Sequence, residues 1–206
     1  MDHTGRAGIV LAGGHSVRFG DRDKALAAVA DDPMLALVVT RLGEVVDDVV
    51  VNCREDQREA FERALATTGV PTRFAVDPVP DQGPLAGLRT ALQAVETEYV
   101  AVVACDMPGL DPSFLDALFD HASERDGAVP TLRGGERQPV QAVYRVDAIR
   151  PAAERSLDAG RRSLHSALDK LDVAVVPAEA VSDGHGRRSL RDLNTPADLD
   201  DFERDA

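Results

Sequence analysis

Residues 8–25 read GIVLAGGHSVRFGDRDKA, and this stretch decides the fold. Its apolar run, residues 9–12, predicts a short buried strand that ends abruptly at Gly13 and Gly14. Because glycine has no Cβ, the backbone at this point can bring its N–H groups close to a ligand. The stretch therefore predicts a binding loop at the end of a buried strand.

The loop after the two glycines is basic, although the chain as a whole is acidic. Arg18, Arg22 and Lys24 all follow within eleven residues of Gly13, which favours an anionic ligand. The loop is not a Walker A motif, since Gly20 is followed by aspartate and not by Lys-Ser/Thr. The spacing of the dinucleotide fingerprint G-x-G-x-x-G is also absent.

Length and composition predict one globular domain over residues 1–206, large enough to bury a core without disulfides. No apolar run approaches the roughly eighteen residues of a membrane span, and residues 1–6 lack the features of a signal peptide. We therefore expect a cytoplasmic protein with no membrane partner. We further expect a monomer or a weak oligomer.

The net charge of −13 argues against a nucleic-acid partner. Aspartate outnumbers glutamate 25 to 11, and the only lysines are Lys24 and Lys170. An acidic, lysine-poor surface is typical of proteins adapted to concentrated salt, which screens self-repulsion. The two cysteines, Cys53 and Cys105, lack metal-binding spacing, and we expect both to be ordinary reduced thiols.

Apolar runs and helical periodicities alternate along the chain, which predicts an α/β fold with a mostly parallel central sheet. We expect an extended segment at 24–29 and a surface loop at 178–188. The expected strands are 9–12, 49–52, 72–76, 99–104, 127–131, 138–144 and 173–176, and the main expected helices are 33–43, 57–67, 84–95, 146–159 and one that starts at Pro196.

Several polar residues follow the predicted strands directly. In a parallel sheet, Gly14, Asn52 and Asp77 would approach one crevice at the carboxyl ends of the strands. Asp106 follows the most apolar strand and is placed to bind Mg²⁺ beside phosphate oxygens, although Asp-Met-Pro could equally be a simple turn. Gly83-Pro84 either opens a helix that faces an anion or is an ordinary helix cap.

The glycine loop also matches a longer pattern, L-A-G-G-x-S-x-R-[FM]-G-x-x-K, except that Lys24 lies one residue late. Further motifs follow in a fixed order: Asn52, Asp77, GPLAG at 83–87, CDMP at 105–108, QP at 138–139, GRR at 160–162 and LNTP at 193–196. With these motifs the chain resembles the MobA-like nucleotidyltransferases, and most closely the molybdenum cofactor guanylyltransferases. The resemblance runs through nearly the full length.

The resemblance implies a three-layer, Rossmann-like nucleotidyltransferase fold. It also implies transfer of GMP from GTP to the terminal phosphate of molybdenum-bound molybdopterin, with Mg²⁺ as cofactor and pyrophosphate as product. Proteins that synthesise molybdopterin or mature molybdoenzymes would then be partners. Cytidylyl relatives carry Leu-Ala-Ala-Gly in the loop, so Gly13 favours GTP, and we expect the missing Cβ to leave room for a larger base.

The resemblance also assigns roles to residues. Arg18, Lys24 and Asp106 would be catalytic, with Asp106 as the magnesium ligand. Nucleotide contacts would come from Leu11, Ala12, Gly13, Gly14, Lys24, Asn52, Asp77, Gly83, Pro84 and Leu85. Arg161, Arg162 and Asn194 are weaker candidates for the acceptor substrate, since an arginine pair is also common on a solvated surface.

Two other functions stay open at this point. One is nucleotidyl transfer to a different phosphorylated acceptor, such as a sugar phosphate or a cytidylyl-type cofactor precursor. The other is a non-catalytic partner that delivers cofactor to molybdoenzymes, which the presence of both Lys24 and Asp106 argues against.

Overall fold

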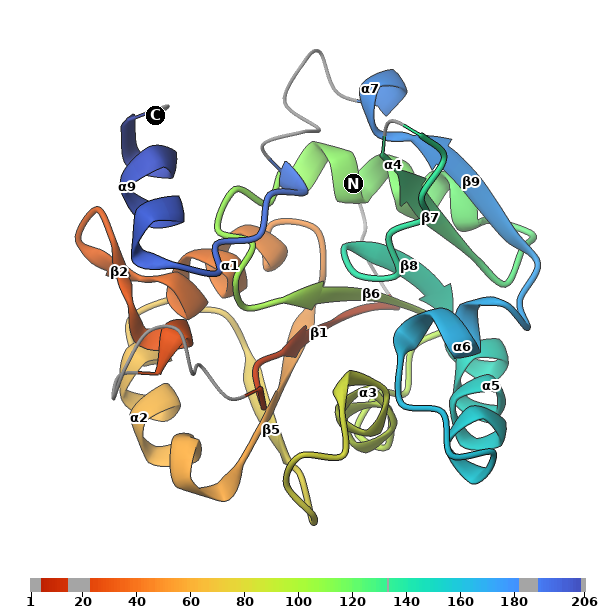
Figure 1. Ribbon diagram of the computed structural model, residues 1–206, viewed down its shortest axis with the longest axis horizontal. Coiled ribbons are helices and arrows are strands. Elements are labelled where there is room, and N and C mark those ends of the chain that lie inside the picture. Colours follow the sequence, from red (N-terminus) through yellow and green to blue (C-terminus); the bar gives the residue numbers. More distant parts are fainter. Residues whose placement is uncertain (1–4, 15–22, 133, 182–188, 205–206) are drawn as a thin grey trace.

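The computed structural model describes residues 5–14, 23–132, 134–181 and 189–204. One seven-stranded sheet crosses the molecule in the order β5-β4-β1-β6-β8-β7-β9 (Figure 1). Its strands are β1 (Arg6–Leu11), β4 (Asp48–Cys53), β5 (Thr72–Val76), β6 (Tyr99–Ala104), β7 (Gly127–Thr131), β8 (Ala142–Arg145) and β9 (Val173–Pro177). The earliest strand, β1, lies between β4 and β6 near the middle of the sheet.

Helices cover both faces of this sheet, so the molecule has three layers (Figure 1). One face carries α1 (Met34–Leu42), α2 (Glu55–Leu65) and α4 (Pro112–Ala122); the other carries α3 (Pro84–Leu92), α5 (Val146–Asp158) and α6 (Leu164–Leu168). The smaller elements are the 3-10 helix η2 (Lys24–Leu26), the strand pair β2 (Ala28–Val29) and β3 (Asp32–Pro33), and the helices α7 (Ala178–Val181) and α9 (Pro196–Arg204).

The apolar run of β6 shows why both faces need a helical layer. Val100 and Val102 pack into the core beneath α3 and α5, whereas Ala101 and Val103 pack into the core beneath α1, α2 and α4. All four side chains are fully buried. A strand that is covered on both faces has a continuous run of hydrophobic residues, and this run is the pattern that predicted the strand at 99–104.

The expected α/β class, with a mostly parallel sheet in three layers, is confirmed. Within the seven-stranded sheet, only β8 of the described strands runs antiparallel to its neighbours, β6 and β7; the separate pair of β2 and β3 is antiparallel as well. Strand β8 follows β7 without an intervening described helix, and a connection without a helical crossover readily gives an antiparallel pair.

Some boundaries differ from those expected. The strand predicted for 138–144 is β8, which begins only at Ala142, because Pro139 has no N–H for the ladder and Gln141 has a φ of 58°. The segment expected to be extended from Lys24 begins instead with η2, whose N-cap Asp23 accepts a hydrogen bond from the N–H of Ala25.

The other differences are smaller. Helix α2 begins at Glu55, two residues before the expected start. The loop expected for 178–188 begins with α7, and residues 182–188 lie outside the described part. None of the described helices has the length and apolar character needed to cross a membrane.

Candidate active site

The carboxyl ends of β1, β4, β5 and β6 meet at one edge of the sheet, and a cavity of about 420 Å³ opens there. The start of α3 closes it on one side. Its walls are formed by Leu11, Gly13, Gly14, Asn52, Asp77, Val79, Asp81, Gln82, Gly83, Pro84, Ala86, Ala104 and Val140. The crevice expected from the strand ends is therefore present in the structure.

Asn52 and Asp77 form a hydrogen-bonded pair in the wall of this cavity. The Asn52 Nδ2 donates to Asp77 Oδ1 at 2.8 Å and to the carbonyl oxygen of Ala75 at 3.1 Å. Asn52 is only 2% exposed. Its amide therefore fixes the Asp77 carboxylate with one oxygen engaged.

Two glycines make room for this pair. A Cβ on Gly13 would lie 2.8 Å from Asp77 Oδ2 and 3.2 Å from Asn52 Oδ1, and a Cβ on Gly87 would lie 2.3 Å from Asn52 Oδ1. The expectation that Gly13 leaves space for a larger base stays a prediction, and the structure shows a further reason for glycine at this position. The space that a Cβ would need is taken by the Asn52–Asp77 pair, which presses against the loop backbone.

The start of α3 forms the opposite rim. Gly83 has a φ of 85° and Pro84 occupies the first helical position, which is a typical helix start. The N–H of Leu85 donates to the carbonyl oxygen of Arg162 at 3.2 Å, and the Arg162 Nη1 lies 3.4 Å from the carbonyl oxygen of Asp81. Arg162 therefore lies against the rim of this cavity and not at a separate surface.

A second polar cluster lies beside the cavity, at the end of β6. The Lys24 Nζ donates to Asp106 Oδ2 at 2.6 Å and to Asn194 Oδ1 at 2.7 Å. The side chains of Lys24 and Asp106 are 13% and 20% exposed. Three residues from distant parts of the sequence thus meet at one charged contact, including the weak acceptor-site candidate Asn194.

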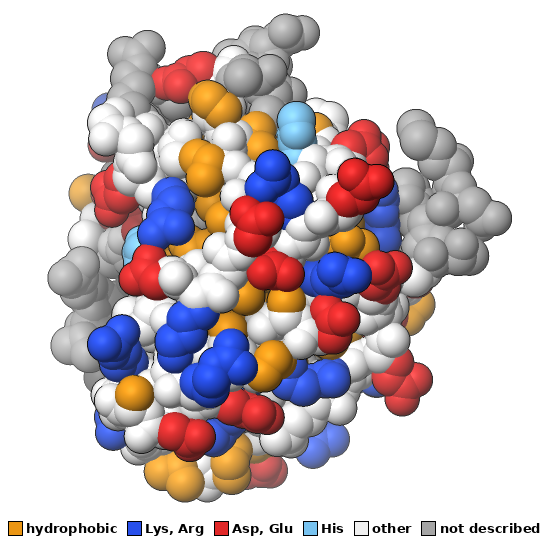
Figure 2. Space-filling view, turned by 90° about the vertical axis from the view of Figure 1, so that its right-hand side faces the viewer, with side chains coloured by type: hydrophobic (Ala, Val, Ile, Leu, Met, Phe, Trp, Pro, Cys, Tyr) orange, Lys and Arg blue, Asp and Glu red, His pale blue; other side chains and the backbone are white. Residues whose placement is uncertain are grey.

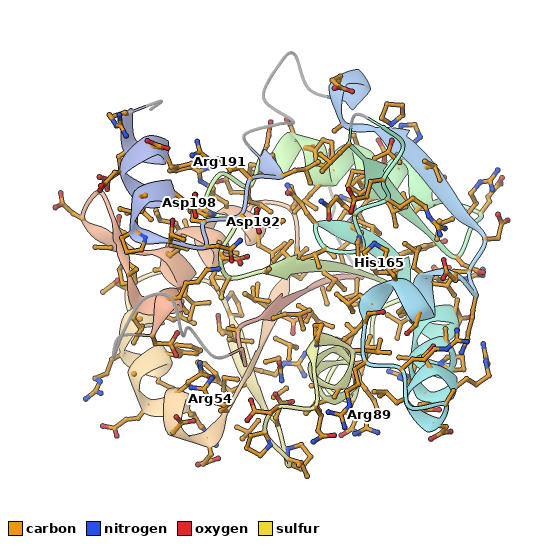
Figure 3. All side chains as sticks on the ribbon, in the orientation of Figure 1. Arg54, Arg89, His165, Arg191, Asp192 and Asp198 are labelled. Atoms are coloured by element: carbon orange, nitrogen blue, oxygen red, sulfur yellow. The ribbon has the colours of Figure 1, made fainter. Side chains whose placement is uncertain are left out.

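The segment before α9 holds Asn194 in this place. The N–H of Leu193 donates to the carbonyl oxygen of Asp106 at 2.9 Å. Asp198 accepts hydrogen bonds from the N–H groups of Asn194 and Thr195 and from the Thr195 hydroxyl. These bonds, led by the Thr195 hydroxyl, lower the pKa of the Asp198 carboxyl. Figure 3 shows Asp198 near Asp192, whose carboxylate accepts from the Asn194 amide.

The oxygen atoms around Lys24 fit a hard divalent cation. The Asp106 carboxylate and the Asn194 side-chain oxygen already converge on one positive charge, the Lys24 ammonium. Carboxylate and amide oxygens are the ligands that Mg²⁺ prefers. No set of three or more His, Cys, Asp or Glu residues in the described segments is arranged to hold a metal. A magnesium ion at Asp106 would accordingly need oxygens from a ligand as well.

Three residues that the sequence analysis did not identify form hydrogen bonds at the side of the glycine loop that faces α2. They are Asp23, Arg54 and Gln57, and Arg54 lies beside α2 in Figure 3. A polar residue on the buried face of an amphipathic helix is the signal that could have found Gln57, which is 4% exposed. Arg54 and Asp23 carry no such signal, since charged residues in loops are common.

The structure places most of the predicted site residues either at the cavity or in the charged cluster beside it. The two glycines of the loop, Leu11, the Asn52–Asp77 pair and the start of α3 line the cavity, while Lys24, Asp106 and Asn194 form the adjacent charged cluster. The side chains of Ala12 and Leu85 point into the core, so only their backbone can serve a ligand. Arg161 is exposed next to Arg162, and Arg18 lies outside the described residues.

An open, mostly parallel sheet with a glycine loop, a cavity and a Lys–Asp pair at its carboxyl edge is typical of α/β proteins that bind a ligand at the ends of their strands. The model of the MobA-like NTP transferase domain matches residues 8–173. The chain belongs to this family, and it is therefore a nucleotidyltransferase.

Individual relatives agree with this assignment. A probable molybdenum cofactor guanylyltransferase of Natronomonas pharaonis is 44% identical over 195 residues, which cover 95% of each chain. The molybdenum cofactor guanylyltransferase of Pseudomonas entomophila is 34% identical and covers 91% of this chain and 93% of its own.

A solved structure supports the fold. The molybdopterin-guanine dinucleotide biosynthesis protein A of Archaeoglobus fulgidus superposes with a TM-score of 0.77 at 23% identity, over 96% of this chain and 97% of its own.

Proposed function

We propose that this chain is a molybdenum cofactor guanylyltransferase. It transfers GMP from GTP to the terminal phosphate of molybdenum-bound molybdopterin and releases pyrophosphate, and the whole chain acts as one catalytic domain. The observation that carries the proposal is the contact of Lys24 with Asp106 and Asn194 beside the cavity. It joins the glycine loop, the central strand β6 and the segment before α9 at one point.

The cavity accounts for the nucleotide half of the reaction. Its largely apolar walls, formed by Leu11, Val79 and Pro84 among others, suit a flat base, and the Asn52–Asp77 pair supplies polar groups for the base or ribose. The backbone N–H groups of Gly13 and Gly14 and the Lys24 ammonium then lie toward the phosphates.

The reaction needs no nucleophile from the protein, because the attacking atom is an oxygen of the acceptor phosphate. A bond forms between this oxygen and the α-phosphorus of GTP, and the bond from the α-phosphorus to the bridging oxygen of pyrophosphate breaks. The site must align these atoms and neutralise the charge that builds on the leaving pyrophosphate. Lys24 supplies a positive charge for that purpose once it turns from Asp106 to the nucleotide.

Asp106 would hold Mg²⁺, with Asn194 contributing a neighbouring oxygen. When bound, the ion neutralises phosphate charge and orients the triphosphate. We assign Asn194 to the acceptor side of the site, and its position is fixed by the bonds that Asp198 accepts. The chain's own residues thus position both substrates.

The test is an assay of the purified protein in concentrated salt with Mg²⁺, molybdenum-loaded molybdopterin and each of GTP, CTP, ATP and UTP. We expect pyrophosphate release and attached nucleotide with GTP alone, and loss of both in Asp106→Asn. Transfer of CMP, or transfer only to another phosphorylated acceptor, would contradict the proposal. So would GTP binding without turnover, which fits a delivery protein.

A further inference from the structure

Arg54 and Gln57 have no role in the proposed reaction. Their side chains contact the glycine loop from the side of α2. The Arg54 Nη1 donates to the carbonyl oxygens of Gly13 at 3.1 Å and Gly14 at 2.9 Å. The Gln57 Nε2 donates to the carbonyl oxygen of Ala12 at 3.1 Å. Three consecutive carbonyl groups of the loop therefore accept hydrogen bonds from the start of α2.

These bonds determine where the loop directs its donors. In a trans peptide, the carbonyl group of one residue and the N–H of the next point to opposite sides. Carbonyls of Ala12 and Gly13 that face α2 thus direct the N–H groups of Gly13 and Gly14 away from it. Helix α2 covers one face of the sheet, and the cavity that both glycines line is closed by α3 from the other face.

Gln57 also ties the far end of the loop to the same helix. Its Nε2 donates to Asp23 Oδ2 at 2.5 Å, and its Oε1 accepts from the N–H of Arg54 at 2.8 Å. The other oxygen of Asp23 caps η2, the turn that carries Lys24. One glutamine therefore links the glycines to the turn that carries the lysine.

The side chains of Arg54 and Gln57 are largely buried, so their positions against the loop are restricted. The Arg54 side chain is 11% exposed and Gln57 is 4% exposed. Hydrogen bonds from a guanidinium are stronger than neutral ones, and Nε and Nη2 of the same group bind the Asp56 carboxylate, which fixes the orientation of Nη1. A lysine ammonium cannot make both sets of contacts.

We propose that Arg54 and Gln57 are positioning residues that orient the N–H groups of Gly13 and Gly14, and the turn of Lys24, toward GTP. This inference rests on the proposed function, since it names GTP as the ligand. It goes further by assigning to α2, a helix outside the cavity, control over nucleotide affinity and turnover.

The test compares Arg54→Ala, Arg54→Lys, Gln57→Ala and Gln57→Glu with the unchanged protein. Gln57→Glu keeps the size and the acceptor for the Arg54 N–H, but places a carboxylate against Asp23 and the Ala12 carbonyl. The matched control is Arg58→Ala on the same helix, because Arg58 is 50% exposed and pairs with Glu62. The readouts are kcat, the KM for each substrate, the dissociation constant of GTP and the melting temperature.

We expect Arg54→Ala and Gln57→Glu to lower kcat/KM for GTP by roughly 10- to 100-fold. The KM for GTP should rise in both while the KM for molybdopterin stays unchanged, whereas a smaller folded fraction would lower kcat and leave both KM values as they are. Arg54→Lys should recover part of the loss, and Arg58→Ala should behave as the unchanged protein.

Variants that keep both kcat/KM and GTP affinity within about twofold would overturn the inference, and so would an equal loss for both substrates. If the unchanged protein binds GTP but transfers nothing to molybdopterin, the proposed function fails. The GTP affinities of the same variants still decide the role of Arg54 and Gln57 in that case. Should Arg54→Ala not fold, Arg54→Lys and Gln57→Glu give the answer.

Discussion

Gly13 lines the cavity, and its missing side chain leaves the space that Asn52 and Asp77 occupy in the cavity wall. We predict that Gly13→Ala lowers kcat/KM for GTP by roughly 100-fold, because its methyl group would force Asp77 out of its bond with Asn52. Steady-state kinetics check this. Gly14→Ala should cost less, since no atom of the described residues, its chain neighbours aside, lies within 4 Å of a Cβ there. Equal losses in the two variants would contradict the explanation.

Lys24 can be tested against a natural control, because the chain has only one other lysine, Lys170. We predict that Lys24→Ala reduces kcat by roughly 100- to 1000-fold, as expected when a charge that faces the leaving phosphates is removed. Lys170 donates to the Ser156 hydroxyl at 2.9 Å, remote from the cavity residues, and Lys170→Ala should leave kcat unchanged. Comparable effects of the two changes would refute the role of Lys24.

Cys53 lies at the end of β4, next to Asn52, and its thiol should be inert. Burial, and then the nearby Asp77 carboxylate, raise the pKa of Cys53 to about 12. The thiol therefore stays protonated throughout the neutral range, and only the thiolate is a strong nucleophile. We predict negligible reaction with a disulfide reagent at pH 8 in a Cys105→Ser background, and full reaction after unfolding. Rapid reaction of the folded protein would show that Cys53 is accessible.

Much of the site at this scale could be predicted from residue types and their order. Asn52 and Asp77 were placed together because each follows a buried strand, and the structure joins them at 2.8 Å. Arg54 was not foreseen, because its role depends on three-dimensional contact with the carbonyls of Gly13 and Gly14. No local pattern marks an arginine that binds backbone oxygens 40 residues earlier in the chain.

Local sequence patterns also predict some helices and strands well, whereas the boundaries of others depend on backbone geometry and strand pairing. Strand β6 could be located from its apolar run, and helix α3 from the Gly83-Pro84 start. Strand β8 was predicted too long, because Pro139 and the positive φ of Gln141 interrupt the first half of the expected segment 138–144. Periodicity alone does not show where a hydrogen-bonded ladder can begin.

The element with the clearest link to the site is α9, through its N-terminal cap. We predict that Asp198→Ala frays the start of α9 and raises the KM for the acceptor, because Asn194 and Thr195 lose the carboxylate that holds their N–H groups. Kinetics with varied molybdopterin at saturating GTP measure this. Asp200→Ala, on the exposed side of the same helix, is the control.

The contribution of Asp198 to the stability of the fold should depend on pH, and it should decrease in acid. The hydrogen bonds to Asp198 lower its pKa in the folded protein, so its contribution to stability is present above the unfolded pKa and is lost as the pH falls through the folded one. The difference in melting temperature between the unchanged protein and Asp198→Ala should therefore be constant near neutral pH and shrink below about pH 4. A difference that grows in acid would contradict the assignment.

At the scale of the whole molecule, charge is the dominant feature. Acidic and basic side chains lie side by side on the face shown in Figure 2. Ion pairs such as Arg125–Asp172 and Arg137–Asp169 form on the surface of the molecule. These pairs are exposed, so each contributes little to stability. The net charge of −13 remains, and its self-repulsion acts against the compact state.

Salt should therefore stabilise this protein. The Debye length falls from about 10 Å at 0.1 M salt to about 3 Å at 1 M, which screens repulsion among the excess carboxylates. We predict that the melting temperature rises between roughly 0.1 M and molar KCl, whereas a neutral osmolyte matched for water activity gives a smaller rise. Scanning calorimetry over this range measures both. A melting temperature that stays level or falls would mean that the carboxylates do not limit folding, and that the acidic, lysine-poor composition has another cause.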